Sequence, residues 1–129
     1  MRQPTALEAN GVRQEGSLTA NREAWITVRL VAGVEVEVLI DTGFQGGLVL
    51  PESLVQELGL TVIGHQKYEM VGAASGEGTI AWAQVEWLGQ VETVEVLTAE
   101  DYLIGTDLLA DTKLTVDYVL ERFTLERLR

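Results

Sequence analysis

The 129-residue sequence contains no cysteine and a single histidine, His65. The missing thiols exclude a disulfide framework, cysteine-ligated metal centres and a cysteine nucleophile, and one imidazole excludes a metal site built from several histidines. Basic residues are also scarce, since 9 Lys and Arg stand against 20 Asp and Glu and give a formal net charge of −11. Such an acidic chain is repelled by phosphate backbones and by anionic lipid surfaces, so we expect neither nucleic acid nor a membrane as a partner.

Long apolar runs are absent as well. No stretch approaches the roughly 18 residues that a membrane-spanning helix needs, and the polar start of the chain lacks the apolar centre of a signal peptide. We therefore expect a soluble, cytoplasmic protein. The composition, with 47% hydrophobic and 22% charged residues, is that of a folded protein, and the length suits one domain.

Short β-branched runs separated by turns dominate the chain after its first segment. Residues 1–23 show no sustained period, and we expect them to form a loose arm, with one strand at most, before a domain that spans residues 24–129. Short helices are expected over 52–58 and 107–110. The runs that predict strands lie at 25–31, 34–40, 48–50, 60–63, 68–71, 79–87, 91–98, 102–104, 114–116 and 123–125. The sequence thus predicts an all-β barrel or sandwich with one or two short helices.

The tripeptide Asp41-Thr42-Gly43 is the strongest chemical signal. The aspartate follows the apolar pair Leu39-Ile40 at the end of an expected strand, and a hydroxyl and a glycine come next. A carboxylate on a loop whose backbone can approach a partner closely suits a reactive site better than it suits packing. Taken alone, however, an aspartate at a strand end is commonly a turn residue.

Three features in a fixed order resemble the retropepsin-like aspartic proteases, especially their small single-lobe bacterial type. They are the stretch VEVLIDTGFQGGLVLPESLVQELGL, the glycine-rich VGAASGEGTIAWAQVEW and the later YLIGTDLL. The resemblance covers residues 24–118, which is most of the chain. It implies an all-β, retropepsin-like closed barrel with one lobe per chain.

The resemblance also implies roles for individual residues. Asp41 would be catalytic, Thr42 would hydrogen-bond across a dimer axis to steady the loop, and Gly43 would let the loop approach the substrate. A flap hairpin would span residues 68–83, and no cofactor or metal is implied. The other matched positions are the flap tip, Ala74, Ser75 and Gly76, and the paired hydrophobic-hydrophobic-Gly motif, Leu103, Ile104 and Gly105.

Two positions depart from the viral members of that family. Phe44 stands where they have alanine, and we expect its ring either to narrow the site or to pack under the neighbouring strand. Thr106 stands where many of them carry an arginine. The following Asp107 is expected to cap the second short helix.

Peptide hydrolysis of this kind needs two carboxylates that share one proton, one acting as base toward water and the other as acid toward the carbonyl oxygen. The chain supplies one D-T-G, so the second Asp41 must come from another copy across a two-fold axis. The sequence therefore predicts a homodimeric aspartic endopeptidase with a protein or peptide substrate. The aspartates that lack a following Thr/Ser-Gly are Asp101, Asp107, Asp111 and Asp117.

Two other functional hypotheses remain open at this point. One is a non-catalytic dimeric peptide-binding module on the same fold, and the other is an all-β structural protein with a chance D-T-G, which leaves the order of the three motifs unexplained. The alternation over 122–129 fits either a strand at the dimer interface or a strand that closes the barrel of its own chain. His65 is expected on the surface, in a polar link between two strands.

Overall fold

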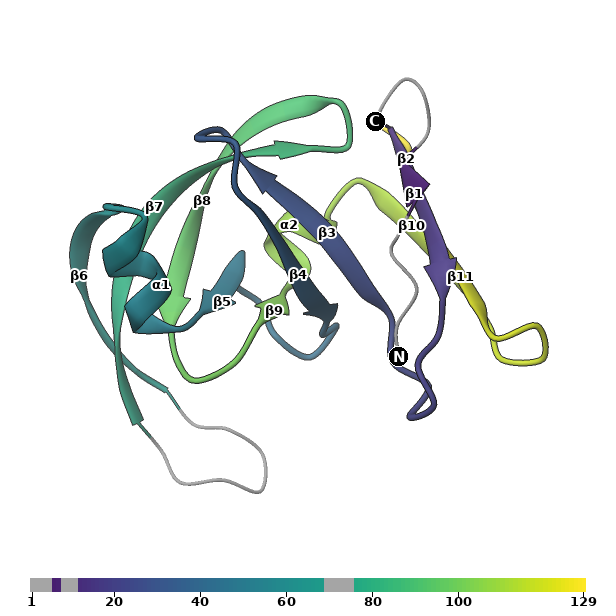
Figure 1. Cartoon of the computed structure of the whole chain (residues 1–129), viewed down its shortest axis with the longest axis horizontal. Coiled ribbons are helices and arrows are strands. Elements are labelled where there is room, and N and C mark those ends of the chain that lie inside the picture. The colour runs from purple at the N-terminus through teal and green to yellow at the C-terminus, as the bar shows by residue number, and fades with distance from the viewer. Residues whose placement is uncertain (1–5, 8–11, 69–75) are drawn as a thin grey trace.

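The structure is a computed structural model that describes residues 6–7, 12–68 and 76–129. Strands dominate these residues, with two short helices, α1 (Glu52–Glu57) and α2 (Thr106–Leu109). Figure 1 shows a curved main sheet with a smaller sheet beside it. The expected all-β class is confirmed.

The main sheet curls back on itself. Its strand order is β3-β4-β9-β5-β8-β7-β6, and β3 also pairs with β7 through Arg29↔Glu86 and Leu30↔Val85. This extra pairing joins two strands that are far apart in the sheet order, so the sheet forms the expected barrel. The strands are β3 (Trp25–Leu30), β4 (Glu35–Ile40), β5 (Leu48–Leu50), β6 (Thr61–Tyr68), β7 (Gly76–Trp87), β8 (Gln90–Thr98) and β9 (Leu103–Ile104).

The core fills this barrel, continues to Phe123 and Leu125 outside it, and follows from alternation along the strands. In β4, Val36 and Val38 are buried while Glu35 stays exposed. The hairpin of β3 and β4 therefore has one apolar face and one solvent-exposed face, which agrees with the alternation of valine and glutamate in the sequence. Trp87 of β7 is fully buried, and its indole Nε1 donates a hydrogen bond to the carbonyl oxygen of Leu108 in α2 at 2.8 Å. The largest fully buried side chains are Trp87, Ile26, Leu48, Leu50, Ile104, Leu108 and Leu125.

The first helix agrees with its predicted limits, but the strand after it does not. Helix α1 starts after Pro51 and is followed by Gly59 at φ +65°, a conformation that favours glycine. The polar link expected around His65 is wrong, because β6 runs without interruption from Thr61 to Tyr68 along β7. Nearly all of its side chains are exposed, so no apolar alternation marks the strand in the sequence. His65 is exposed, as expected.

The smaller sheet has the order β1-β2-β11-β10, with β1 (Ala6–Leu7), β2 (Arg13–Ser17), β10 (Thr112–Asp117) and β11 (Arg122–Arg127). The segment expected to be a loose arm thus contains a strand, β2, that pairs along its whole length with β11. Its partner lies at the far end of the chain, which is why the local pattern shows little of it. Residues 122–129 do not close the barrel, because β11 lies in the small sheet, where β2 and β10 of its own chain occupy both of its edges.

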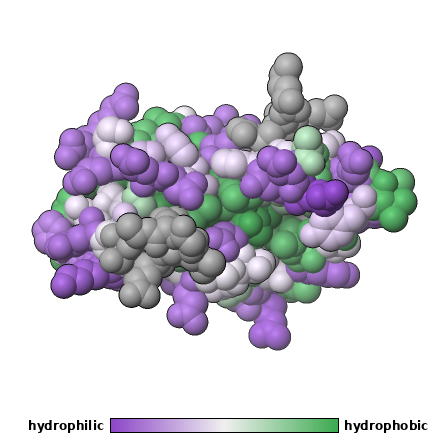
Figure 2. Space-filling view, turned by 90° about the horizontal axis from the view of Figure 1, so that it is seen from below, coloured by the Kyte–Doolittle hydropathy of each residue, from purple (hydrophilic) through white to green (hydrophobic). Residues whose placement is uncertain are grey.

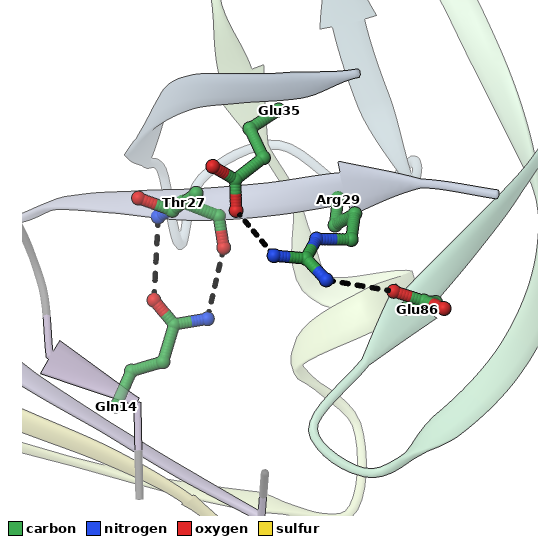
Figure 3. A network of polar contacts seen from close by, with 5 residues as sticks. All are labelled: Gln14, Thr27, Arg29, Glu35 and Glu86. Carbon is green, nitrogen blue, oxygen red and sulfur yellow. Dashed lines mark hydrogen bonds and ion pairs between the residues drawn. The ribbon is translucent and has the colours of Figure 1, made fainter. Parts of the chain in front are cut away.

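A buried glutamine joins the two sheets. Gln14 of β2 is 2% exposed, and its side-chain amide donates to the carbonyl oxygen of Thr27 at 2.9 Å and accepts from the Thr27 N–H at 3.3 Å (Figure 3). Nearby, the Arg29 guanidinium lies 3.1 Å from Glu35 and 3.7 Å from Glu86. These two ion pairs are half-exposed and contribute little to stability, whereas the buried amide pairing holds β2 against β3.

Membrane-spanning helices are not found among the described residues, since none of the helices there is long and apolar enough.

Candidate active site

Asp41 lies directly after β4, where two short motifs meet. Strand β9 runs parallel to β4 with Leu39 opposite Leu103 and Ile40 opposite Ile104, and the Asp41 N–H donates to the Ile104 carbonyl oxygen at 3.0 Å. On its other side β9 pairs antiparallel with β5. The sheet therefore brings the D-T-G segment and the Leu-Ile-Gly segment side by side, as the resemblance implies.

The loop of residues 41–47, here called the Asp41 loop, begins with a tight turn around the carboxylate. The Gly43 N–H donates to Asp41 Oδ1 at 2.9 Å, and the Phe44 N–H donates to the Asp41 carbonyl oxygen at 3.1 Å. Asp41 is half-buried, while Thr42 and Gly43 are exposed. The carboxylate is thus fixed by its own loop, and the two residues after it face outward, where a second molecule can reach them.

The rest of the Asp41 loop is held on the first turn of α2. The Thr106 N–H donates to the Phe44 carbonyl oxygen at 2.8 Å, and the Gly105 N–H donates to that of Gly47 at 2.9 Å. The expected capping by Asp107 is wrong: Gly105 is the N-cap residue, and no side chain caps the helix. Asp107 instead lies in the first turn, and its N–H points to the carbonyl oxygens of Gln45 and Gly46, both at 3.2 Å.

Gly105 is required by this close approach. A Cβ built on it would lie 2.5 Å from both Cδ2 and the carbonyl oxygen of Phe44, and it would also collide with the carbonyl oxygen of Gly46. A Cβ on Gly46 would likewise lie 2.5 Å from Cζ of Phe44. The ring of Phe44 therefore folds back onto its own loop, in the space that two glycines leave open. Phe44 and Gly105 stand out separately in the sequence, and no local pattern there indicates that they are in contact.

The expected flap lies only partly within the described residues. Of residues 68–83, only Tyr68 at the end of β6 and residues 76–83 of β7 are described, with Tyr68 opposite Gly76, whereas Ala74 and Ser75 fall outside the described residues. Gly78 runs so close to β8 that a Cβ there would collide with the carbonyl oxygen of Thr98. Next to it the Thr79 N–H donates to Thr98 Oγ1 at 2.6 Å, which fixes the base of this hairpin to β8.

The surface around Asp41 offers no metal-binding cluster: within the described ranges, no three His, Asp or Glu side chains are grouped to hold an ion. Figure 2 views the face toward which β4 ends. Apolar surface occupies the middle of that face, with hydrophilic side chains around it.

Fold and site together define one lobe of a retropepsin-like protein, in which an Asp-Thr-Gly loop follows one strand and a Leu-Ile-Gly segment lies beside it. A model of the family described as "Aspartyl protease" matches residues 26–108. The chain belongs to this aspartyl protease family.

Solved structures agree with the fold. A foamy viral protease-reverse transcriptase, solved in complex with an RNA/DNA hybrid, is 18% identical with a TM-score of 0.55 over 74% of this chain, which spans only 13% of that protein. The EIAV protease, solved with the inhibitor HBY-793, is 18% identical with a TM-score of 0.52 over 74% of this chain and 92% of its own. At such identities the likeness concerns the fold alone. No curated protein matches this sequence significantly.

Proposed function

We propose that the protein is a homodimeric aspartic endopeptidase in which each copy supplies one Asp41. The observation that carries the proposal is the anchoring of this carboxylate. It follows a strand fixed to β9, and its loop is hydrogen-bonded onto α2 through the carbonyl oxygens of Phe44 and Gly47. Such fixed geometry is what a group in a reactive site needs, because misplacement by about 1 Å costs roughly a hundredfold in rate.

The reaction requires two such carboxylates. One takes a proton from water as the water oxygen bonds to the carbonyl carbon of the peptide, and the other gives its proton to the carbonyl oxygen. The first carboxyl group then gives the proton that it took from water to the amide nitrogen, and the second takes a proton back from a hydroxyl of the tetrahedral intermediate. The C–N bond breaks, which releases an amine and a carboxylic acid. Since the chain contains one D-T-G, the two aspartates come from two copies related by a two-fold axis.

The substrate class follows from the hairpin of β6 and β7. Its strands extend from the barrel on the side of the main sheet away from the small sheet (Figure 1). We propose that this hairpin acts as the flap and holds an extended peptide as an added strand, with Gly76 on its described part. Main-chain hydrogen bonding of this kind binds many sequences, so a denatured protein or an unstructured segment is the expected substrate.

The test is digestion of a proteome-derived peptide library by the unaltered protein and by Asp41→Asn. We expect the substitution to abolish cleavage while the circular dichroism and the oligomeric state stay unchanged. Asp111→Asn is the matched control, because it makes the same charge change at an exposed aspartate that no glycine follows. A statine-type peptide, whose hydroxyl stands in for the tetrahedral intermediate, should inhibit the unaltered protein.

The same experiment decides the alternative of a non-catalytic peptide-binding module. Cleavage that persists in Asp41→Asn would refute the proposed function. Saturable peptide binding without any cleavage by the unaltered protein would favour the binding module instead.

A further inference from the structure

Strand β10 ends the small sheet with a free edge. Among the described residues it pairs with β11 on one side and with no strand on the other. The outward N–H and C=O groups of such an edge are a ready template for another strand. The edge is six residues long and contains no proline, one of the devices that proteins use to block pairing at an edge.

The side chains of β10 carry a pattern along this edge. Lys113 and Asp117 are exposed on one face of the strand, and Leu114 and Val116 are half-buried on the other. No ion pair joins Lys113 to any described residue. The strand therefore carries one positive and one negative charge, four residues apart on the same face and on either side of Thr115.

This pattern is complementary to itself. Two identical strands can pair antiparallel about a two-fold axis that is perpendicular to the sheet. The face that carries Lys113 and Asp117 then lies on the same side of the joined sheet in both copies. With the axis at Thr115, Lys113 stands opposite the partner's Asp117, and Leu114 stands opposite the partner's Val116. Opposite charges and β-branched or apolar residues at directly opposed positions are the pairs that stabilise a sheet.

We propose that two copies of the chain associate through β10, with the small sheets joined into one continuous sheet and the register set by two Lys113–Asp117 pairs. The proposal rests on the proposed function, since half a site per chain calls for a second copy. Strand β11 cannot form this interface, because both of its edges are occupied within its own chain.

The exposed turn after β10 fits the same arrangement. Tyr118, Val119 and Leu120 are 63%, 91% and 68% exposed, an unusual cluster of apolar side chains at a hairpin turn. In the register centred on Thr115, Tyr118 stands opposite the partner's Thr112. The turn then lies beside the segment that leads into the partner's β10, so association covers apolar surface that the single chain leaves in water.

The edge is closely connected to the Asp41 loop. Strand β10 begins soon after α2 ends at Leu109, and the first turn of α2 holds the Asp41 loop by its carbonyl oxygens. In Figure 1 the end of β4 also lies on the side of the main sheet nearest to the small sheet. A partner placed by β10 is thereby placed with respect to Asp41.

The test uses charge reversal with sedimentation velocity. Lys113→Asp turns two attractive pairs into two repulsive ones, so we expect the dimer dissociation constant to rise about thirtyfold. Asp117→Lys should do the same. An equimolar mixture of these two variants should regain dimers, because each mixed pair then joins Asp with Lys, and peptide cleavage should return with them.

Two further variants keep the test decisive. Arg22→Asp makes the same charge change as Lys113→Asp at an exposed loop position outside β10, and it should leave the dissociation constant within about threefold of the unaltered value.

Asp117 Oδ1 accepts hydrogen bonds from the N–H groups of Val119 and Leu120, both at 2.9 Å, so Asp117→Lys also disturbs the turn. Asp117→Asn keeps an acceptor there and should still weaken the dimer severalfold.

Equal weakening by Lys113→Asp and Arg22→Asp would overturn the proposal, because only net charge would then matter. Failure of the mixture to regain dimers would overturn it as well. If the unaltered protein dimerises and Lys113→Asp has no effect, this interface is wrong while the proposed function stands. Retained cleavage in Asp41→Asn is the separate result that would refute the function.

Discussion

A methyl group at Gly105 would meet three atoms of the Asp41 loop. They are the carbonyl oxygens of Gly46 and Phe44 and the ring carbon Cδ2 of Phe44. Two of the three belong to the backbone, so no change of side-chain rotamer relieves the contact. Gly105→Ala must therefore push the Asp41 loop away from α2.

The cost follows from the contacts that the shift would loosen. Overpacking of a rigid site costs about 1–3 kcal/mol. The hydrogen bonds from Thr106 N–H to Phe44 and from Gly105 N–H to Gly47, at 2.8 and 2.9 Å, would lengthen, at about 1 kcal/mol each. We expect Gly105→Ala to lower the free energy of unfolding by roughly 3–5 kcal/mol, a large part of the ~5–15 kcal/mol of a typical domain.

Urea denaturation measures this loss, and Gly64→Ala is the matched control. A Cβ on Gly64 meets no atom within 4 Å, so its substitution should change stability by less than about 0.5 kcal/mol. Adding Phe44→Ala to Gly105→Ala should restore about 1 kcal/mol, because it removes one of the three collisions. For the folded fraction of Gly105→Ala we also expect a fall in kcat of about a hundredfold. Unchanged stability and kcat would refute this account of the Asp41 loop.

Two further outcomes are expected. Gln14→Leu should cost roughly 2–4 kcal/mol in urea denaturation, since it strips the Thr27 N–H and C=O of their partner, and a loss below about 1 kcal/mol would argue against the amide link between the sheets. Trp87→Phe replaces the buried indole by a smaller ring and leaves the Leu108 carbonyl oxygen unpaired, so thermal denaturation should show a loss of at least about 1–3 kcal/mol; a variant as stable as the unaltered protein would show that neither the hydrogen bond nor the lost volume matters.

Much of the barrel was predictable because its strands carry local signals. Val36 and Val38 alternate with glutamates, and Pro51 and Gly59 mark the ends of α1 by their backbone preferences. Asp41 was predictable for a similar reason, since an acid, a hydroxyl and a glycine follow an apolar strand within one tripeptide. In each case the determinant lies within a few residues of the element that it specifies.

The errors concern elements whose determinants are distant in the sequence. Strand β2 is ordered by β11 and by the contact of Gln14 with Thr27, and none of these partners is adjacent in the chain. Strand β6 is nearly all exposed, so its pairing with β7 rather than its own pattern makes it a strand. Asp107 was expected to cap α2, but the carbonyl oxygens of the Asp41 loop occupy the N–H groups of that turn.

Phe44 shows why a departure from a family pattern has to be judged together with its contacts. Considered alone, a bulky ring after Asp-Thr-Gly suggested either a narrowed site or packing under the neighbouring strand. In the structure the ring lies against Gly46 and Gly105, at positions where any Cβ would collide with it. The large side chain and the two glycines therefore form one packing unit, which fixes the Asp41 loop on α2. Because that unit helps to hold Asp41 in place, the aromatic residue does not by itself indicate a narrowed site. A Cβ on Gly46 meets only ring atoms of Phe44, which can move, whereas a Cβ on Gly105 also meets two backbone oxygens, so Gly105→Ala should harm the loop more than loss of the ring itself.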